Sequence, residues 1–254
     1  MPKRKYGHIP SKKDDRDFKM IAPRQLVAAL PSSVDLRAKM PPVWDQFGQG
    51  ACVAHATGAA FAYDLIVKGD PPLMPARDFI YYNARDIEGT TDQDAGCEPR
   101  DALNAINGLG VPDESLWAYS DADLLAKPGL EVYQDATAHA SIVYNAVDQS
   151  SEGLRAALAS GLPVIIGIQA YASLESDAVA ASGIIPMPAT NEECLSGHSM
   201  LLAGYQTNAD NSISYITRNS WGPEWGQAGY CIIQEAYLLN PTLCSDLWCL
   251  QSCN

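Results

Sequence analysis

The chain of 254 residues has few positive charges and no long apolar run. Lys and Arg together number 17 against 30 Asp and Glu, so the formal net charge is −13 and the pI is about 4.6. This acidic excess argues against nucleic acid and anionic lipid as partners, because both bind basic surfaces. No apolar run approaches the roughly 20 residues that a membrane span needs, so no membrane association is expected.

The N-terminus also lacks the apolar stretch of a secretory signal. Residues 1–19 are basic and polar, with a charged start but no hydrophobic core, so no signal peptide is predicted. We expect residues 1–30 to form a strap or short pro-segment, followed by a body over residues 31–254. The length and the 47% apolar content suit one large domain or two lobes that share a cleft.

Cysteine occurs seven times, an odd number that leaves at least one thiol unpaired. The positions are Cys52, Cys97, Cys194, Cys231, Cys244, Cys249 and Cys253. Up to three disulfides would favour a secreted or extracytoplasmic protein, whereas reduced buried thiols would fit the cytoplasm. Zinc at Cys244, Cys249 and Cys253 is a third interpretation, although their spacing lacks the paired knuckles of structural zinc sites.

The body changes from helical patterns to strand patterns near residue 140. Helices are predicted over residues 52–68, 76–86, 99–107 and 151–160. Short β-branched runs bounded by turns predict strands within residues 141–147, 163–171, 199–205, 212–219 and 229–237. This order indicates an α+β protein. Its expected parts are a helical lobe at about 41–135, a β-rich lobe at about 136–240 and a Cys-containing tail at 241–254.

Cys52 is the candidate nucleophile. It follows the turn Gly48-Gln49-Gly50 and opens an Ala-rich helix, and a helix N-terminus lowers the pKa of a thiol. On this residue alone, a buried cysteine without a function is the alternative. Gln46 lies six residues earlier, where its amide can donate to the oxyanion that forms when a thiolate attacks a carbonyl.

The remaining candidate groups lie far downstream. His198, at the head of the strand in SGHSMLLAGY, can take up the thiol proton and return it to the leaving amine. Asn219, in RNSWGPEWGQAGY, can hold the tautomer of that imidazole, and Trp221 can shield their bond from water. Each residue alone has a structural interpretation. Together with Cys52 they predict a thiolate–imidazolium cysteine hydrolase.

These motifs resemble those of the papain family of cysteine peptidases. The matching runs are PSSVDLR, GQGACVAHA, GHSMLLAGY and RNSWGPEWGQAGY, while RDFIYYNAR is similar to the bacterial branch of the family. The resemblance covers about residues 31–250. It implies a papain-like two-lobe fold, with a helical left lobe and a β-barrel right lobe. The active-site cleft would lie between them, with Cys52 and His198 facing across it.

The resemblance also implies roles for individual residues. The catalytic residues would be the nucleophile Cys52, the base His198, the orienting Asn219 and the oxyanion donor Gln46. The substrate-binding residues would be Gly96 through backbone pairing, Gly167 in the main specificity pocket, and Trp221. No metal and no cofactor take part.

The chain departs from the family pattern close to the nucleophile. Val53 stands where Trp is usual, and Gln49 stands where many members have a disulfide cysteine, so Cys97 lacks that partner. His55 lies one helical turn beyond Cys52, where an aromatic residue is usual. It is either a buried structural histidine or a group that perturbs the thiolate. These departures bear on substrate preference and remove no catalytic group.

The predicted activity is that of a cysteine endopeptidase, with a peptide or protein substrate and a thioester formed on Cys52. A catalytically weak binding protein on the same fold and a cysteine transpeptidase or amidase are the alternatives. The protein is expected to be a monomer. Residues 1–30 are shorter than the helical pro-region of many family members. We expect them to cross or neighbour the cleft and limit access, because their Lys and Arg face an acidic body.

Overall fold

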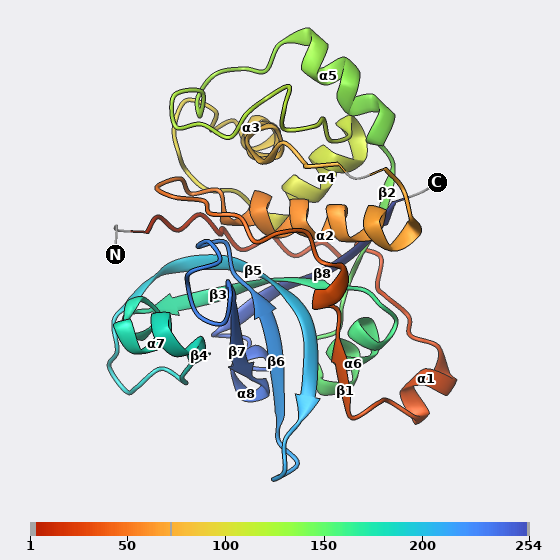
Figure 1. Cartoon of the computed structure of the whole chain (residues 1–254), viewed down its shortest axis with the longest axis vertical. Helices are drawn as coiled ribbons and strands as arrows, with labels where there is room; N and C mark the ends of the chain where they lie inside the picture. The colour runs from red at the N-terminus through yellow and green to blue at the C-terminus, as the bar shows by residue number, and fades with distance from the viewer. Residues whose placement is uncertain (1–3, 72, 253–254) are drawn as a thin grey trace.

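The helical lobe and the sheet lobe lie one above the other in the computed structural model, which describes residues 4–71 and 73–252 (Figure 1). The helices of the upper lobe are α2 (Cys52–Lys68), α3 (Arg77–Glu88), α4 (Pro99–Leu109) and α5 (Leu130–Ala136). The first three confirm the helices predicted there, to within two residues at each end. Pro99 occupies the first turn of α4, where the missing backbone N–H leaves no hydrogen bond unmade.

The lower lobe is one sheet with the strand order β2-β8-β3-β5-β6-β7-β4, to which β1 adds by pairing with β5. The strands are β1 (Ser33–Asp35), β2 (Ile142–Ala146), β3 (Val164–Tyr171), β4 (Ile184–Ile185), β5 (Cys194–Thr207), β6 (Ile213–Arg218), β7 (Tyr230–Gln234) and β8 (Cys244–Ser252). Three short helices accompany them: α6 (Ser151–Ala159), α7 (Asp177–Ser182) and α8 (Glu235–Leu238). Within the described residues no strand ladder joins the end strands β2 and β4. The β-rich lobe of the predicted two-lobe fold is therefore built on one sheet.

Most of the predicted C-terminal tail, residues 244–252, is a strand inside the sheet, and residues 253–254 lie outside the described part of the chain. Strand β8 lies between β2 and β3, with Trp248 opposite both Ala146 and Ile165. Its sequence, CSDLWCLQS, has no β-branched residue, so its conformation depends on partners that are distant in sequence. The end of the strand predicted over 229–237 is also corrected, since helix α8 follows β7 there.

Helix α2 lies where the two lobes meet. All residues from Cys52 through Leu65 are buried, and small Ala and Gly side chains allow neighbouring elements to approach closely. The core around α2 also contains Ile142, Trp248 and Leu250, which come from β2 and β8. A shared core therefore fixes the N-terminus of α2 relative to the sheet.

The N-terminal residues run between the lobes and then along the sheet lobe (Figure 1). We call residues 4–12 the cleft segment and residues 13–30, which include helix α1 (Arg24–Ala28), the outer segment. The His8 N–H donates to the Gly197 carbonyl of β5, and the Ile9 N–H donates to the Cys97 carbonyl just before α4, each at 3.1 Å. The cleft segment is thus hydrogen-bonded to both lobes.

The six cysteines in the described part of the chain are free thiols, and Cys253 lies outside it. The expected disulfides do not form among these six. The strand registers give the reason, because Cys194 lies opposite Tyr171 and Cys249 lies opposite Asn145. Residues 4–71 and 73–252 also hold no group of three or more His, Cys, Asp or Glu arranged for a metal ion.

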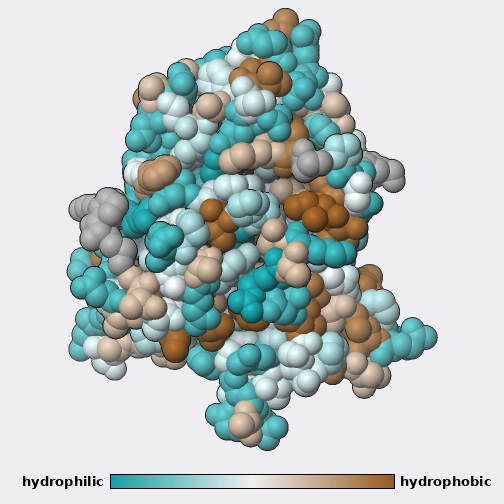
Figure 2. Space-filling view, in the orientation of Figure 1, coloured by the Kyte–Doolittle hydropathy of each residue, from teal (hydrophilic) through white to brown (hydrophobic). Residues whose placement is uncertain are grey.

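The surface is mixed in character. On the face shown in Figure 2, hydrophobic residues occur in small groups among hydrophilic ones. Over residues 4–71 and 73–252, no helix has both the length and the apolar character needed to cross a bilayer.

Candidate active site

Cys52 is the first residue of α2 and is fully buried beneath the cleft segment. Its sulfur accepts a hydrogen bond from the Ser199 N–H at 3.4 Å. Burial raises the pKa of the Cys52 thiol to about 11, although backbone N–H groups of Ser199 and Gly7 act in the opposite direction. With the cleft segment in place, burial therefore outweighs the expected effect of the helix N-terminus and favours the neutral thiol.

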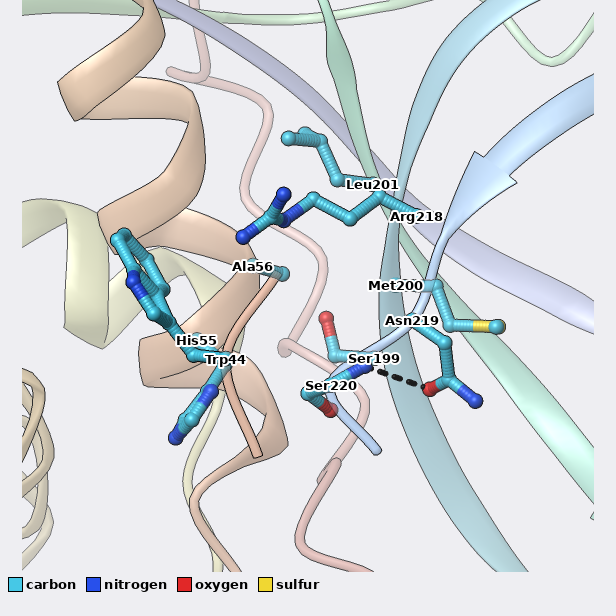
Figure 3. Close-up of a pocket in the computed structure, with 9 residues that line it drawn as sticks. All are labelled: Trp44, His55, Ala56, Ser199, Met200, Leu201, Arg218, Asn219 and Ser220. Carbon is cyan, nitrogen blue, oxygen red and sulfur yellow. Dashed lines mark hydrogen bonds between the residues drawn. The ribbon is translucent and has the colours of Figure 1, made fainter. Parts of the chain in front are cut away.

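His198 and Asn219 are brought together from neighbouring parts of the sheet lobe, β5 and the end of β6. The His198 Nε2 atom lies 2.8 Å from Asn219 Oδ1. The Ser220 N–H donates to the same oxygen at 2.8 Å, shown by the dashed line in Figure 3. This oxygen is an acceptor for both groups, so Nε2 of the neutral imidazole carries the proton and Nδ1 keeps its lone pair.

The backbone next to His198 contacts the sulfur of Cys52, because the following residue, Ser199, donates its N–H to that sulfur. His198 Nδ1 is buried and has no hydrogen-bond partner among the described residues. Burial lowers the pKa of His198 to about 4 against the raising effect of the Asn219 bond, and His8 and Arg4 lower it further. The closed cleft thus favours neutral forms of both the thiol and the imidazole.

Trp221 lies over the imidazole. Its ring centroid is 5.2 Å from that of His198, and its side chain is buried. Tyr6 of the cleft segment meets the His198 ring edge-on at 5.6 Å. The two aromatic rings exclude water from the hydrogen bond between His198 and Asn219.

Gln46 has its amide fixed by a residue that the sequence analysis did not single out. Its Oε1 accepts from the Ser220 hydroxyl at 2.5 Å, and its backbone N–H donates to the Ser220 carbonyl at 2.8 Å. The Nε2 group then points the other way and donates to the carbonyls of Gln49 at 2.8 Å and Lys5 at 2.9 Å. Ser220 directly follows Asn219 in the sequence, and that adjacency was the available signal.

Gly96 lies beside the cleft segment, which forms backbone hydrogen bonds with the next residue, Cys97. The Cys97 N–H donates to the Gly7 carbonyl at 2.9 Å, while the Gly96 N–H donates to the Tyr81 hydroxyl at 2.8 Å. A Cβ on Gly96 would lie 2.4 Å from the Gly7 carbonyl oxygen, and its φ is 82°. Glycine is therefore required here by both close approach and backbone conformation.

Gly167 lies on β3 and faces the ring of His8. A Cβ at this position would lie 1.9 Å from His8 Nε2, so only glycine leaves room for the ring. The position predicted to line the main specificity pocket is thus filled by a side chain of the cleft segment.

His55 and Val53 are buried on α2. The His55 ring meets the rings of Tyr119 and Trp44 edge-on, at 5.1 Å and 6.3 Å. Burial, with the charges of Arg77 and Arg218, lowers the pKa of His55 well below its usual value. A neutral imidazole that packs between aromatic rings favours the interpretation of His55 as a structural residue.

A small cavity lies between α2 and the sheet, and Asn219 is one of the residues that line it (Figure 3). Its volume of about 10 Å³ corresponds to at most one water molecule. The lining residues are Trp44, His55, Ala56, Ser199, Met200, Leu201, Arg218, Asn219 and Ser220. The cavity is too small for substrate.

Comparison with known proteins places the chain in a family. The model of the papain family cysteine proteases matches residues 30–244. An uncharacterized peptidase C1-like protein of Acanthamoeba polyphaga mimivirus is 30% identical over 98% of this chain and 87% of its own length. Cysteine proteinase 3 of Entamoeba histolytica is 30% identical over 82% of this chain, which spans 64% of that protein. The chain therefore belongs to the papain family of cysteine proteases.

Solved structures agree with this assignment. Xylellain, a cysteine protease from Xylella fastidiosa, superposes with a TM-score of 0.91 at 33% identity, covering 100% of this chain and 99% of its own. The recombinant stem bromelain precursor has a TM-score of 0.71 at 18% identity, covers 93% of this chain and 74% of its own, and shows the shared fold. The protein has the papain-like two-lobe fold and is a cysteine peptidase that acts on peptide bonds.

Proposed function

We propose that the protein is an endopeptidase in which Cys52 is the nucleophile, His198 the general base and acid, Asn219 the orienting residue and Gln46 an oxyanion donor. The observation that carries this assignment is the Asn219 oxygen, which accepts from both His198 Nε2 and the Ser220 N–H. This bond leaves His198 Nδ1 as the basic atom of the ring, and the residue after His198 contacts the Cys52 sulfur through its backbone N–H.

The reaction follows from these positions. The Cys52 proton passes to His198, and the sulfur attacks the substrate carbonyl to form a tetrahedral oxyanion. Gln46 Nε2, whose orientation is fixed by Ser220, donates to that oxygen. His198 then protonates the leaving amine, which leaves a thioester on Cys52. Water, deprotonated by His198, hydrolyses the thioester and restores the thiol.

The cleft segment blocks this reaction in the closed form. The Lys5 carbonyl accepts a hydrogen bond from Gln46 Nε2 at 2.9 Å, so this group is not free to bind an oxyanion. The Gly7 N–H hydrogen-bonds to the Cys52 sulfur. The same segment buries both catalytic groups and so favours their neutral forms over the thiolate–imidazolium pair. Residues 4–12 therefore act as an inhibitor within the chain. When these residues leave the cleft, Gln46 is free to bind the oxyanion and Cys52 is again exposed to water.

The catalytic assignment is tested by covalent labelling of the full chain. An epoxysuccinyl peptide at mildly acidic pH should add once per molecule, since ordinary thiols are mostly protonated there. Intact mass should show this adduct in the Cys194→Ser control, which removes an exposed thiol. The adduct should be absent from Cys52→Ala. Persistence of the label in Cys52→Ala would contradict the assignment.

Endopeptidase action is tested separately with an internally quenched peptide that is blocked at both ends. Such a substrate offers no free terminus, so its hydrolysis requires cleavage within the chain. Once the cleft segment is displaced, the full chain and Cys194→Ser should cleave this peptide at equal rates. Cys52→Ala should not cleave it. Cleavage only of peptides with a free terminus would instead indicate an exopeptidase.

A further inference from the structure

The side chain of His8 fills a pocket between strands β3, β5 and β8. It is completely buried, and its Nε2 atom lies 3.0 Å from Asp246 Oδ2. Two glycines form the walls, because a Cβ on Gly167 would lie 1.9 Å from His8 Nε2 and a Cβ on Gly197 would lie 2.8 Å from His8 Nδ1. Gly197 immediately precedes His198, so the pocket adjoins the catalytic base.

Asp246 provides a carboxylate at the inner end of this pocket. Its side chain is only 4% exposed. From the body it accepts hydrogen bonds from the Ser245 hydroxyl at 3.0 Å and, more weakly, from the Trp248 indole at 3.4 Å. The cleft segment supplies its other partners, which are His8 Nε2 and the Ser11 N–H at 3.1 Å.

Departure of the cleft segment would remove the imidazole partner of this carboxylate. Among the ion pairs formed by residues 4–71 and 73–252, His8 is the partner of Asp246. Arg100, which packs on the Trp248 ring at 5.4 Å, pairs with Asp17 instead. A poorly solvated carboxylate that retains only neutral donors strongly favours a positively charged group.

We propose that Asp246 is a specificity-determining residue, which selects substrates that place an Arg, Lys or His side chain in the pocket now filled by His8. The inference rests on the proposed peptidase function. His8 then occupies the place of the substrate side chain, and the two glycines leave the depth that a long basic side chain needs to reach the carboxylate. A charge-assisted hydrogen bond of this kind is stronger than contact with a neutral side chain.

Binding to the emptied pocket tests the proposal without requiring catalysis. The full chain carrying Cys52→Ala and His8→Gly would be titrated at pH 5.5 with imidazole, and with pyrazole, a ring of the same shape that stays neutral. Imidazole should bind at least tenfold more tightly, seen as a larger rise of Tm with concentration. Adding Asp246→Asn should remove the difference, whereas adding Asp210→Asn, at an exposed carboxylate, should keep it. Equal binding of the two rings, or a preference that survives Asp246→Asn, would overturn the proposal.

Substrate selection is measured in the full chain with Arg4→Ala and His8→Gly, which loosen the cleft segment. Paired fluorogenic peptides would carry Arg or norleucine at each of the three positions before the cleaved bond. At one position kcat/KM should favour Arg at least tenfold, and Asp246→Asn should abolish that preference. A preference for norleucine at every position would overturn the inference. Failure to cleave any peptide would count against the peptidase function, and imidazole binding would still decide the chemistry of the pocket.

Discussion

The cleft segment and the outer segment belong to the same N-terminal stretch but differ in how they meet the body. Arg4 and His8 have side chains that are 9% and 0% exposed, and both pair with body carboxylates. Phe18 and Ile21 of the outer segment are 79% and 88% exposed. The difference supports the proposal that the cleft segment, and not the outer segment, is the part that limits access to Cys52.

The ion pairs of the two segments show the same contrast. Arg4 reaches Asp45 at 2.5 Å in a largely buried setting and also lies over the Trp221 ring at 5.5 Å. Arg16 pairs with its near neighbour Asp14 and remains 90% exposed. Exposed pairs contribute little to stability, because water and salt screen them. Both segments carry charged side chains, so charge alone does not distinguish them. They differ in how deeply those side chains are buried against the body.

The largest effect should come from removing the cleft segment. A chain without residues 1–12 should react with the epoxysuccinyl peptide at Cys52 roughly 100-fold faster than the full chain, because two buried charge-assisted contacts of about 1.5 kcal/mol each are lost. The matched control replaces Phe18 and Ile21 by Ser and should leave the rate unchanged. Circular dichroism and Tm would establish that both variants are folded. Equal labelling of the truncated and full chains would end the distinction between the segments.

A single arginine should reproduce part of this effect. Arg4→Ala removes the pair with Asp45 and the contact with Trp221, and should raise the labelling rate about tenfold, equivalent to about 1.4 kcal/mol. Arg16→Ala deletes the same chemical group from the outer segment and should have no effect. If both variants raise the labelling rate equally, the overall positive charge of the N-terminal residues, and not the buried contact of Arg4, holds the cleft segment in place.

Acid should open the cleft. The closed form lowers the pKa of His198 to about 4 from its usual 6.5, so the open form binds more protons between these values. Lowering the pH through that window should therefore favour the open form, and closure regains its full strength above pH 6.5. The labelling rate of the full chain, divided by that of the truncated chain, should rise by up to tenfold per pH unit. A flat ratio would show that His198 does not gain exposure on opening.

Salt should have the smallest effect. Lys5 pairs with Asp94 at 2.7 Å and Lys12 with Glu98 at 3.9 Å, and their side chains are 46% and 91% exposed. Screening of these pairs between 50 and 500 mM NaCl should speed labelling of the full chain by about two- to threefold. The truncated chain serves as the control and should not respond. A much larger increase of the labelling rate with salt would show that exposed ion pairs, and not buried contacts, keep the cleft closed.

The sequence was most predictive where local pattern and burial agree. Helix α2 was predicted because a small-residue run starts at a turn and stops at Gly69, which adopts the left-handed conformation with φ of 79°. Residues far apart in sequence, such as Cys52 and His198, could be assigned because each stands in a recognisable motif. These features depend on short stretches of chain.

Features that depend on distant contacts were missed. Strand β8 lacks a strand-like sequence and is ordered by β2 and β3. The pairing of Cys97 with the cleft segment follows from the path of that segment, which no local pattern encodes. The same holds for Ser220, whose role appears only when Gln46 and Asn219 are seen on either side of it.

The core shared by α2, β2 and β8 determines how this cleft can open. Because Trp248 and Leu250 pack with α2 in one buried cluster, separating the lobes would require breaking that cluster. Detaching residues 4–12 leaves that cluster intact, because its members come from other parts of the chain. Access to Cys52 is then a local opening of a few residues on a fixed frame, with a free energy below that of global unfolding. Amide hydrogens of His8 and Ile9 should accordingly exchange sooner than those within α2.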